Sequence, residues 1–170
     1  MIIFDTDILS MFAKANVLDV IVKALSRFKL CITPKIKEEL SIPLEYGYSF
    51  PEEIFKFKKF EVIVPTKEEY LAYEKLLALY PFLGKGELEA ISIAKMRNCF
   101  FATNDLKAFN VALKEKVLPI NVHTILRTLW EKKFYNKSEL LEFIQKLERA
   151  DNTKIKDIDK IFTLAVEKNR

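Results

Sequence analysis

Carboxylates occur where several apolar segments of the sequence end, or where the next helical segment begins. They come from four separate parts of the chain: Asp5, Asp7, Glu38, Glu39, Glu87, Glu89 and Asp105. Like charges that converge repel one another unless a cation lies between them. A ligand set made of carboxylate oxygens, with no His or Cys, favours Mg²⁺ or Mn²⁺. Such ions can activate a water and stabilise a phosphoryl transition state. The pattern predicts a divalent-metal site if the fold gathers these acids.

Each of these acids also has a purely structural explanation. An acid that directly follows an apolar run could cap the next helix. Glu87 and Glu89 could interact favourably with a helix N-terminus, and Glu38 and Glu39 could form a solvated face beside neighbouring lysines. The structural explanation is favoured for any single acid, whereas convergence of several acids on one edge of a sheet favours the metal site.

Five apolar runs alternate with longer segments of helical period. The runs are continuous and rich in Ile, Val or Phe, which predicts strands covered on both faces, over residues 2–4, 29–33, 61–65, 99–103 and 118–122. The helical period predicts helices over residues 7–28, 34–43, 67–80, 86–97 and 105–116. This alternation indicates an open, doubly wound α/β fold with a parallel sheet. Ligands bind beyond the carboxyl ends of such strands, where the acids are expected.

The pattern changes after residue 122. Three helical segments follow, over residues 123–134, 137–150 and 158–169, with short polar connectors between them. We therefore expect a domain over residues 1–125 and a helical extension over residues 126–170 that packs on it.

Composition narrows the class of protein. The chain has 170 residues with a net charge of +4, which permits nucleic-acid binding through a local patch but does not demand it. No apolar run approaches the roughly 18 residues of a membrane span, so no membrane association is expected. The first seven residues contain acids and no basic segment, so no signal peptide is expected and the predicted location is cytoplasmic.

Four motifs in the chain carry a family resemblance. They are IIFDTDIL, ITPKIKEEL, LGKGELEAISIAK and FFATNDLKAF. In order and spacing they resemble the PIN-domain family, metal-dependent ribonucleases that include the toxins of many prokaryotic toxin–antitoxin pairs. The resemblance covers about residues 1–125 and leaves the C-terminal helices outside it.

The resemblance implies roles for particular residues. Four acids match the catalytic positions of the family: Asp5, Glu39, Glu89 and Asp105. Three of these match positions that ligate Mg²⁺ or Mn²⁺: Asp5, Glu89 and Asp105. Neighbouring residues are secondary candidates: Asp7, Glu87, Thr103 and Glu38. Glu87 matches an additional acid of one subgroup, and either supports the site or is itself a ligand.

The resemblance also implies a fold and an activity. The expected fold is a five-stranded parallel sheet with strand order 3-2-1-4-5 and helices on both faces. The expected activity is hydrolysis of RNA phosphodiester bonds by a metal-activated water. The expected partners are RNA, a second copy of the chain in a homodimer, and a small antitoxin protein that blocks the site.

One further stretch, EYGYSFPEEIFKFKKF over residues 45–60, combines six aromatic residues with Lys56, Lys58 and Lys59. Interleaved aromatic and basic residues can stack on bases and contact phosphates. An amphipathic arm that buries its aromatics against the domain or a second subunit fits equally well. In proteins of the resembled family this stretch is a helical arm near the cleft, so we favour a partner contact over an RNA contact.

Two other functions fit parts of the sequence. FDTDIL fits the Asp-x-Asp motif of haloacid-dehalogenase-like phosphatases, with Asp5 as nucleophile and Asp7 as general acid. That alternative lacks the late Gly-Asp-x-x-x-Asp motif and leaves Glu39 and Glu89 without roles. The other alternative is a non-catalytic module of the same fold, which would hold RNA or a partner protein without cleavage.

Overall fold

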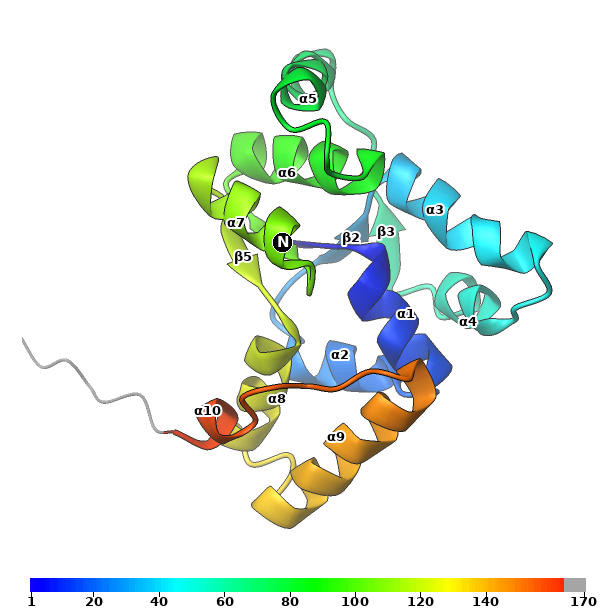
Figure 1. The fold of residues 1–170 in the computed structure, drawn as a ribbon, viewed down its shortest axis with the longest axis vertical. Helices are drawn as coiled ribbons and strands as arrows, with labels where there is room; N and C mark the ends of the chain where they lie inside the picture. The colour runs from blue at the N-terminus through cyan, green and yellow to red at the C-terminus, as the bar shows by residue number, and fades with distance from the viewer. Residues whose placement is uncertain (164–170) are drawn as a thin grey trace, which may run out of the picture.

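The computed structural model describes residues 1–163 and contains one parallel sheet (Figure 1). Its five strands are β1 (Ile2–Phe4), β2 (Leu30–Ile32), β3 (Phe60–Val62), β4 (Phe100–Ala102) and β5 (Leu118–Ile120). Their order is β3-β2-β1-β4-β5, which confirms the predicted parallel sheet and its strand order. Phe4 of β1 pairs with Ala102 of β4, so Asp5 and Thr103 leave the sheet as neighbours.

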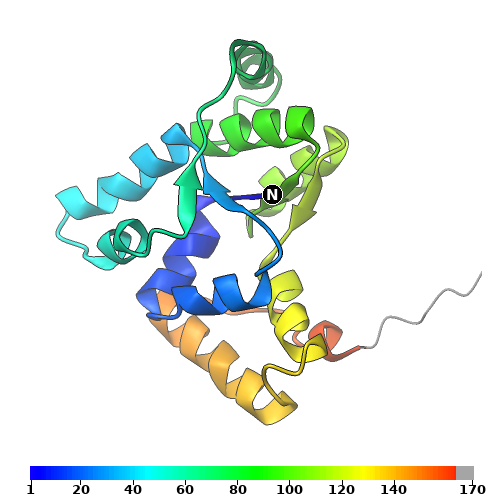
Figure 2. The ribbon, with the colours of Figure 1, turned by 180° about the vertical axis from the view of Figure 1, so that it is seen from behind.

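Helices cover both faces of the sheet. Those that lead to β4 and β5 are α5 (Lys67–Leu79), α6 (Lys85–Arg97) and α7 (Leu106–Lys114). Those that lead to β2 and β3 are α1 (Thr6–Lys14), α2 (Leu18–Ala24), α3 (Pro34–Glu45) and α4 (Phe50–Lys56). In both views α6 and α2 lie on opposite sides of the strands (Figures 1 and 2). The arrangement is that of a doubly wound sheet.

The segment over residues 7–28 forms two helices instead of the predicted one. Helix α1 ends at Lys14 and α2 begins at Leu18. Between them Asn16 has φ 54°, the left-handed region that asparagine tolerates better than most residues. The apolar period continues across this turn because both helices face the core, so the sequence shows no interruption there.

Burial differs between the centre and the edges of the sheet. Strands β1 and β2 are buried throughout. Strands β3 and β5 are the edge strands, and Val62 and Leu118 in them are 43% and 61% exposed. The prediction that every strand is covered on both faces is therefore wrong for β3 and β5, because the helices pack mainly over the middle of the sheet.

The C-terminal helices pack on the first two helices. They are α8 (Val122–Glu131), α9 (Lys137–Asp151) and α10 (Asp159–Phe162). Helix α9 lies against α1 and α8 lies against α2 (Figure 1). Leu129 and Ile144 are buried in the same hydrophobic cluster as Ile3 of β1.

The structure bears on two predictions for this region, the domain boundary and the last helix. The proposed domain boundary after residue 125 falls inside α8, and the division into two parts stays a prediction. The predicted helix over residues 158–169 begins as α10, and its residues 164–169 lie outside the described part of the chain. Among residues 1–163, no helix is both long and apolar enough to span a bilayer.

Candidate metal centre

Asp5 stands at the carboxyl end of β1. Its N–H donates to the carbonyl of Ala102 at 2.8 Å, which continues the sheet pairing by one residue. The residue is 3% exposed. Oδ1 accepts from the Thr6 N–H at 2.8 Å, and Oδ2 accepts from the Thr103 hydroxyl at 2.9 Å. Asp5 is thus both the cap of α1 and a buried acid beside the end of β4.

The residues that follow β4 position two further acids. Asp7 Oδ2 accepts from the Asn104 N–H at 2.7 Å, which ties the start of α1 to the end of β4. The N–H of Asp105 donates to Thr103 Oγ1 at 3.1 Å. Asp105 Oδ1 then accepts from the Ala108 N–H at 2.8 Å and caps α7. The Thr103 hydroxyl therefore joins Asp5 and Asp105.

The start of α6 positions the two glutamates. Glu87 Oε2 accepts from the Gly84 N–H at 2.7 Å, and Glu39 of α3 reaches the Gly86 N–H with Oε1 at 2.9 Å. A Cβ atom at Gly86 would lie only 2.6 Å from Glu39 Oε2. Glycine at this position therefore allows the Glu39 carboxylate to touch the backbone of α6.

These acids share one cavity of about 400 Å³. Five of the candidate acids line it: Asp5, Asp7, Glu39, Glu87 and Asp105. Within residues 1–163, its lining includes no lysine, arginine or histidine. The cavity lies beyond the carboxyl ends of β1 and β4, as expected for a ligand site in this type of sheet.

The lining also includes residues that the sequence analysis did not single out. Asp151, at the end of α9, is one of them, and its Oδ1 forms an ion pair with Lys14 Nζ at 2.6 Å. Asn104 is another, and its Oδ1 accepts from the Val122 N–H at 2.9 Å. Asp151 lies outside all four motifs, so no local signal in the sequence points to it.

Burial and mutual repulsion disfavour the charged forms of these acids. The pKa of Asp5 is well above its usual range, first because the side chain is buried and then because of the charges of Asp7 and Glu87. Burial raises the pKa of Asp7 to about 6. Burial, with smaller contributions from Asp105, Asp7 and Glu39, raises the pKa of Glu87 to about 7. Burial also raises the pKa of Glu39. A cation in the cavity would relieve this repulsion.

The donor set fits a hydrated hard cation. Within residues 1–163, Glu39, Glu87 and Asp105 each have one carboxylate oxygen bonded to a backbone N–H and one in no hydrogen bond. No three His, Cys, Asp or Glu side chains of this part of the chain converge closely enough to enclose an ion directly. Mg²⁺ characteristically keeps several waters and uses one or two carboxylates, so all-oxygen donors around an open cavity suit it.

Glu89 and Glu38 do not line the cavity. Glu89 is buried, and its Oε2 accepts from the Lys35 N–H at 3.0 Å in the first turn of α3. Glu38 is exposed. Residues two apart on a helix point about 200° from each other, so only one of Glu87 and Glu89 can face the cavity from α6.

The stretch over residues 45–60 contains α4. Several of its aromatics, Phe50 and Phe57 among them, pack against the core. Tyr46 is 76% exposed, and Lys56 Nζ pairs with Glu52 at 2.7 Å. Lys56, Lys58 and Lys59 do not line the acidic cavity. Their contact with RNA or a partner stays a prediction.

The chain is similar to known proteins in its sequence pattern and in its fold. A family model described as PIN domain matches residues 1–158. No curated protein matches the chain. The solved structure of VapBC-1 from nontypeable Haemophilus influenzae is similar, with 19% identity and a TM-score of 0.54 over 71% of this chain and 98% of that chain. The structure of VapBC2 from Rickettsia felis, bound to a DNA fragment from the VapBC2 promoter, is also similar. It has 18% identity and a TM-score of 0.55, again over 71% and 98% of the two chains.

Proposed function

Because the chain belongs to the PIN-domain family, we propose that it is a Mg²⁺- or Mn²⁺-dependent ribonuclease that hydrolyses RNA phosphodiester bonds. The observation that carries this proposal is the convergence of Asp5, Glu39, Glu87 and Asp105 on one cavity at the end of β1 and β4. Structural caps alone do not explain why acids from four segments share one partly buried space without a cation among the described lining residues.

Each acid has a proposed role. Asp5, Glu87 and Asp105 would hold a hydrated ion, with at least one of the three carboxylates acting through a bound water and with Asp7 beside them. When bound, the ion supplies an activated water and stabilises the charge that develops on the phosphate. Glu39 lies on the α6 side of the same cavity, fixed by the Gly86 N–H, where its carboxylate can accept a proton from the attacking water. Thr103 positions Asp5 and Asp105.

Glu87 takes the ligand role that the motif resemblance assigned to Glu89. Only Glu87 lines the cavity, whereas Glu89 binds the Lys35 N–H at the start of the helix that carries Glu39. Glu89 is therefore a positioning residue in this proposal, because it acts on Glu39 through the placement of α3.

Incubation of the purified protein with a mixed-sequence RNA and Mn²⁺ or Mg²⁺ tests the activity. We expect cleavage by the wild type, none with EDTA, and none with Asp5→Asn. Glu74→Gln, which removes an exposed acid on α5, is a matched control and should cleave normally. Cleavage that survives Asp5→Asn would contradict the proposed site. RNA binding without cleavage under any divalent metal would support the non-catalytic module instead.

The presence of Glu39 and Glu87 beside Asp5 also favours a nuclease over the haloacid-dehalogenase-like alternative. A phosphatase with Asp5 as nucleophile has no use for these two acids. A phosphorylated Asp5 after reaction with a phosphate monoester would reverse this preference.

We further propose that the chain acts as the toxin of a toxin–antitoxin pair, with a small antitoxin protein and a homodimer as its assemblies. Support for the toxin and its antitoxin comes from the similarity of its fold to two VapBC structures. The homodimer is proposed from the family resemblance. Light scattering after size exclusion tests the homodimer. Co-purification with the product of a neighbouring small gene, accompanied by loss of RNA cleavage, tests the antitoxin.

A further inference from the structure

A second pocket adjoins the acidic cavity. Its volume is about 340 Å³, within the range of small-ligand sites in proteins. Met11, Asn104 and Thr153 line both spaces, so the two are contiguous. A polymer that passes through the acidic cavity could therefore place its next unit in this pocket.

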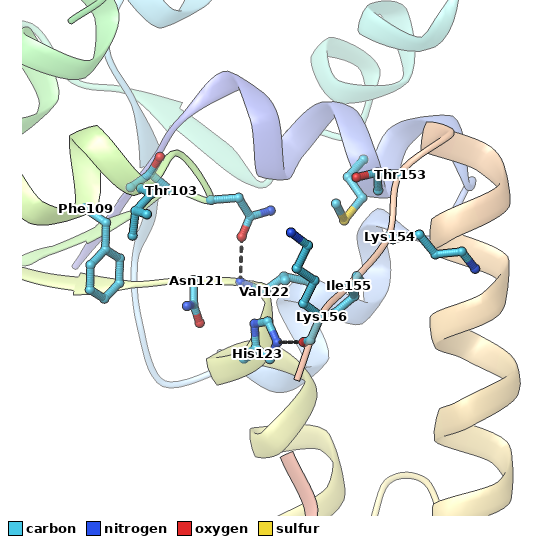
Figure 3. Close-up of a pocket in the computed structure, with 12 residues that line it drawn as sticks. Thr103, Phe109, Asn121, Val122, His123, Thr153, Lys154, Ile155 and Lys156 are labelled. Carbon is cyan, nitrogen blue, oxygen red and sulfur yellow. Dashed lines mark hydrogen bonds between the residues drawn. The ribbon is translucent and has the colours of Figure 1, made fainter. Parts of the chain in front are cut away.

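One wall of the pocket is apolar and includes an aromatic ring. Phe109 of α7 is half-buried, and among residues 1–163 it is not part of the hydrophobic cluster or of the side chains packed against it. Leu106, one turn earlier, is 71% exposed. Figure 3 shows the Phe109 ring extending from α7 at the edge of the pocket. The ring is thus available to a ligand.

The opposite wall comes from the chain that follows α9. The side chain of Lys156 extends into the pocket (Figure 3). Lys156 takes part in none of the salt bridges within residues 1–163, whereas the nearby Lys154 pairs with Glu148 at 2.9 Å. A lysine that lines a pocket and forms no salt bridge among the described residues is suited to bind an anionic group.

This wall is held in place by specific contacts. Ile155 is buried, and its N–H donates to Glu148 Oε1 at 2.9 Å. The carbonyl of Lys156 lies 2.6 Å from Nε2 of His123, which carries the proton of this bond because a carbonyl can only accept (Figure 3). The pocket is therefore formed in the protein before any ligand enters.

We propose that this pocket binds one unpaired nucleotide of the RNA next to the scissile phosphate, with its base on Phe109 and an adjacent phosphate on Lys156. The inference rests on the proposed ribonuclease function. A base can reach an aromatic side chain in a pocket only when it is unstacked, so the substrate is single-stranded at this point. The segment over residues 153–156 thereby contributes to the choice of substrate.

The test is the affinity of the full chain for a short fluorescent single-stranded RNA of mixed sequence, measured by anisotropy with Ca²⁺ in place of Mg²⁺. Phe109→Ala should weaken binding about tenfold, as expected for the loss of one base–aromatic stack. Phe109→Tyr should retain binding, which separates stacking from any effect on folding. Leu113→Ala removes an exposed apolar side chain from the same helix and should have no effect.

Lys156→Ala tests the phosphate contact in the same assay. Binding should weaken severalfold, and the slope of log K against log salt should become less steep by about 0.7, the value for one phosphate of a single strand. Lys75→Ala removes an exposed lysine on α5 and should leave the slope unchanged.

The outcomes separate this inference from the ribonuclease proposal. If the wild type binds and cleaves RNA while both pocket variants bind normally, the pocket assignment is overturned and the ribonuclease stands. If duplex RNA of the same sequence binds as tightly and with the same sensitivity to Phe109→Ala, the claim that the bound nucleotide is unpaired is overturned. If the wild type neither binds nor cleaves any RNA, both proposals are overturned.

Discussion

The hydroxyl of Thr103 donates to Oδ2 of Asp5 at 2.9 Å, across the ends of two neighbouring strands. The hydroxyl oxygen of Thr103 accepts the N–H of Asp105 at 3.1 Å. This contact exists because β1 and β4 pair in parallel with Phe4 opposite Ala102, so the residues that follow each strand meet. One buried hydroxyl thereby sets the relative position of two acids that we propose as metal ligands.

Thr103→Val should remove this link while keeping the shape of the side chain. We expect RNA cleavage and affinity for Mn²⁺ to fall about 10- to 100-fold, the usual effect when a group that orients a metal ligand is lost. Isothermal titration with Mn²⁺ and cleavage assays measure the two quantities. Thr103→Ser keeps the hydroxyl and should retain most of the activity. Equal behaviour of the valine and serine variants would contradict the role of the hydroxyl.

Gly86→Ala should separate Glu39 from α6. The added Cβ would lie 2.6 Å from Glu39 Oε2, so the carboxylate must leave the Gly86 N–H. Cleavage should fall by about tenfold or more if Glu39 accepts a proton. The melting temperature should change little because alanine is favourable in a helix. Gly84→Ala is the matched control, since its Cβ would meet Glu87 Oε2 only at 3.4 Å. A fully active Gly86→Ala would count against a role for Glu39.

Glu87→Gln and Glu89→Gln should differ in their effect on metal binding. Glu87 lines the cavity, so its amide variant should bind Mn²⁺ at least about tenfold more weakly. Glu89→Gln keeps an oxygen that can accept the Lys35 N–H and should bind Mn²⁺ normally. Calorimetry on both variants measures this directly. The reverse pattern would restore Glu89 as the ligand.

The stability of the metal-free protein should depend on pH through Glu87. Folding raises its pKa from 4.5 to about 7, so the folded state binds more protons than the unfolded state in this interval. The Glu87 contribution to stability is therefore fully present below pH 4.5 and is lost as pH rises through 7. In EDTA, Glu87→Gln should become more stable than the wild type as pH rises from 5 to 8, by about 3 kcal/mol at most.

Denaturant unfolding of both proteins at several pH values measures this difference. The comparison cancels the titration of the groups that do not interact with Glu87, whereas the pKa of Asp5 responds to the Glu87 charge and changes with it. Saturating Mg²⁺ at pH 8 should stabilise the wild type more than Glu87→Gln, because the ion compensates the charge. A stability difference that does not vary with pH would show that Glu87 titrates alike in the folded and unfolded chains.

Much of the fold could be predicted from local patterns. The apolar runs located all five strands, and the largest shift is at β3, where the predicted end is residue 65 and the strand ends at Val62. Thr66 and Glu69 have capping-box spacing and form that box at the start of α5. The break at Asn16 was not predictable, since its left-handed turn leaves the apolar period intact on both sides.

Part of the candidate site could likewise be predicted from the sequence, and part could not. The sequence by itself determined that acids follow strands and begin helices, because capping and strand ends leave local signatures. Asp5 and Asp105 became candidates in this way, whereas Glu39 was selected over Glu38 only by the motif resemblance. Only the tertiary structure decided that Glu87 faces the cavity and Glu89 does not, because that depends on the rotation of α6 against β1. Only the tertiary structure brought Asp151 to the acids and Lys156 to the adjoining pocket. Those contacts arise from the packing of α9 on α1, and packing between segments far apart in the chain leaves no pattern in either segment alone.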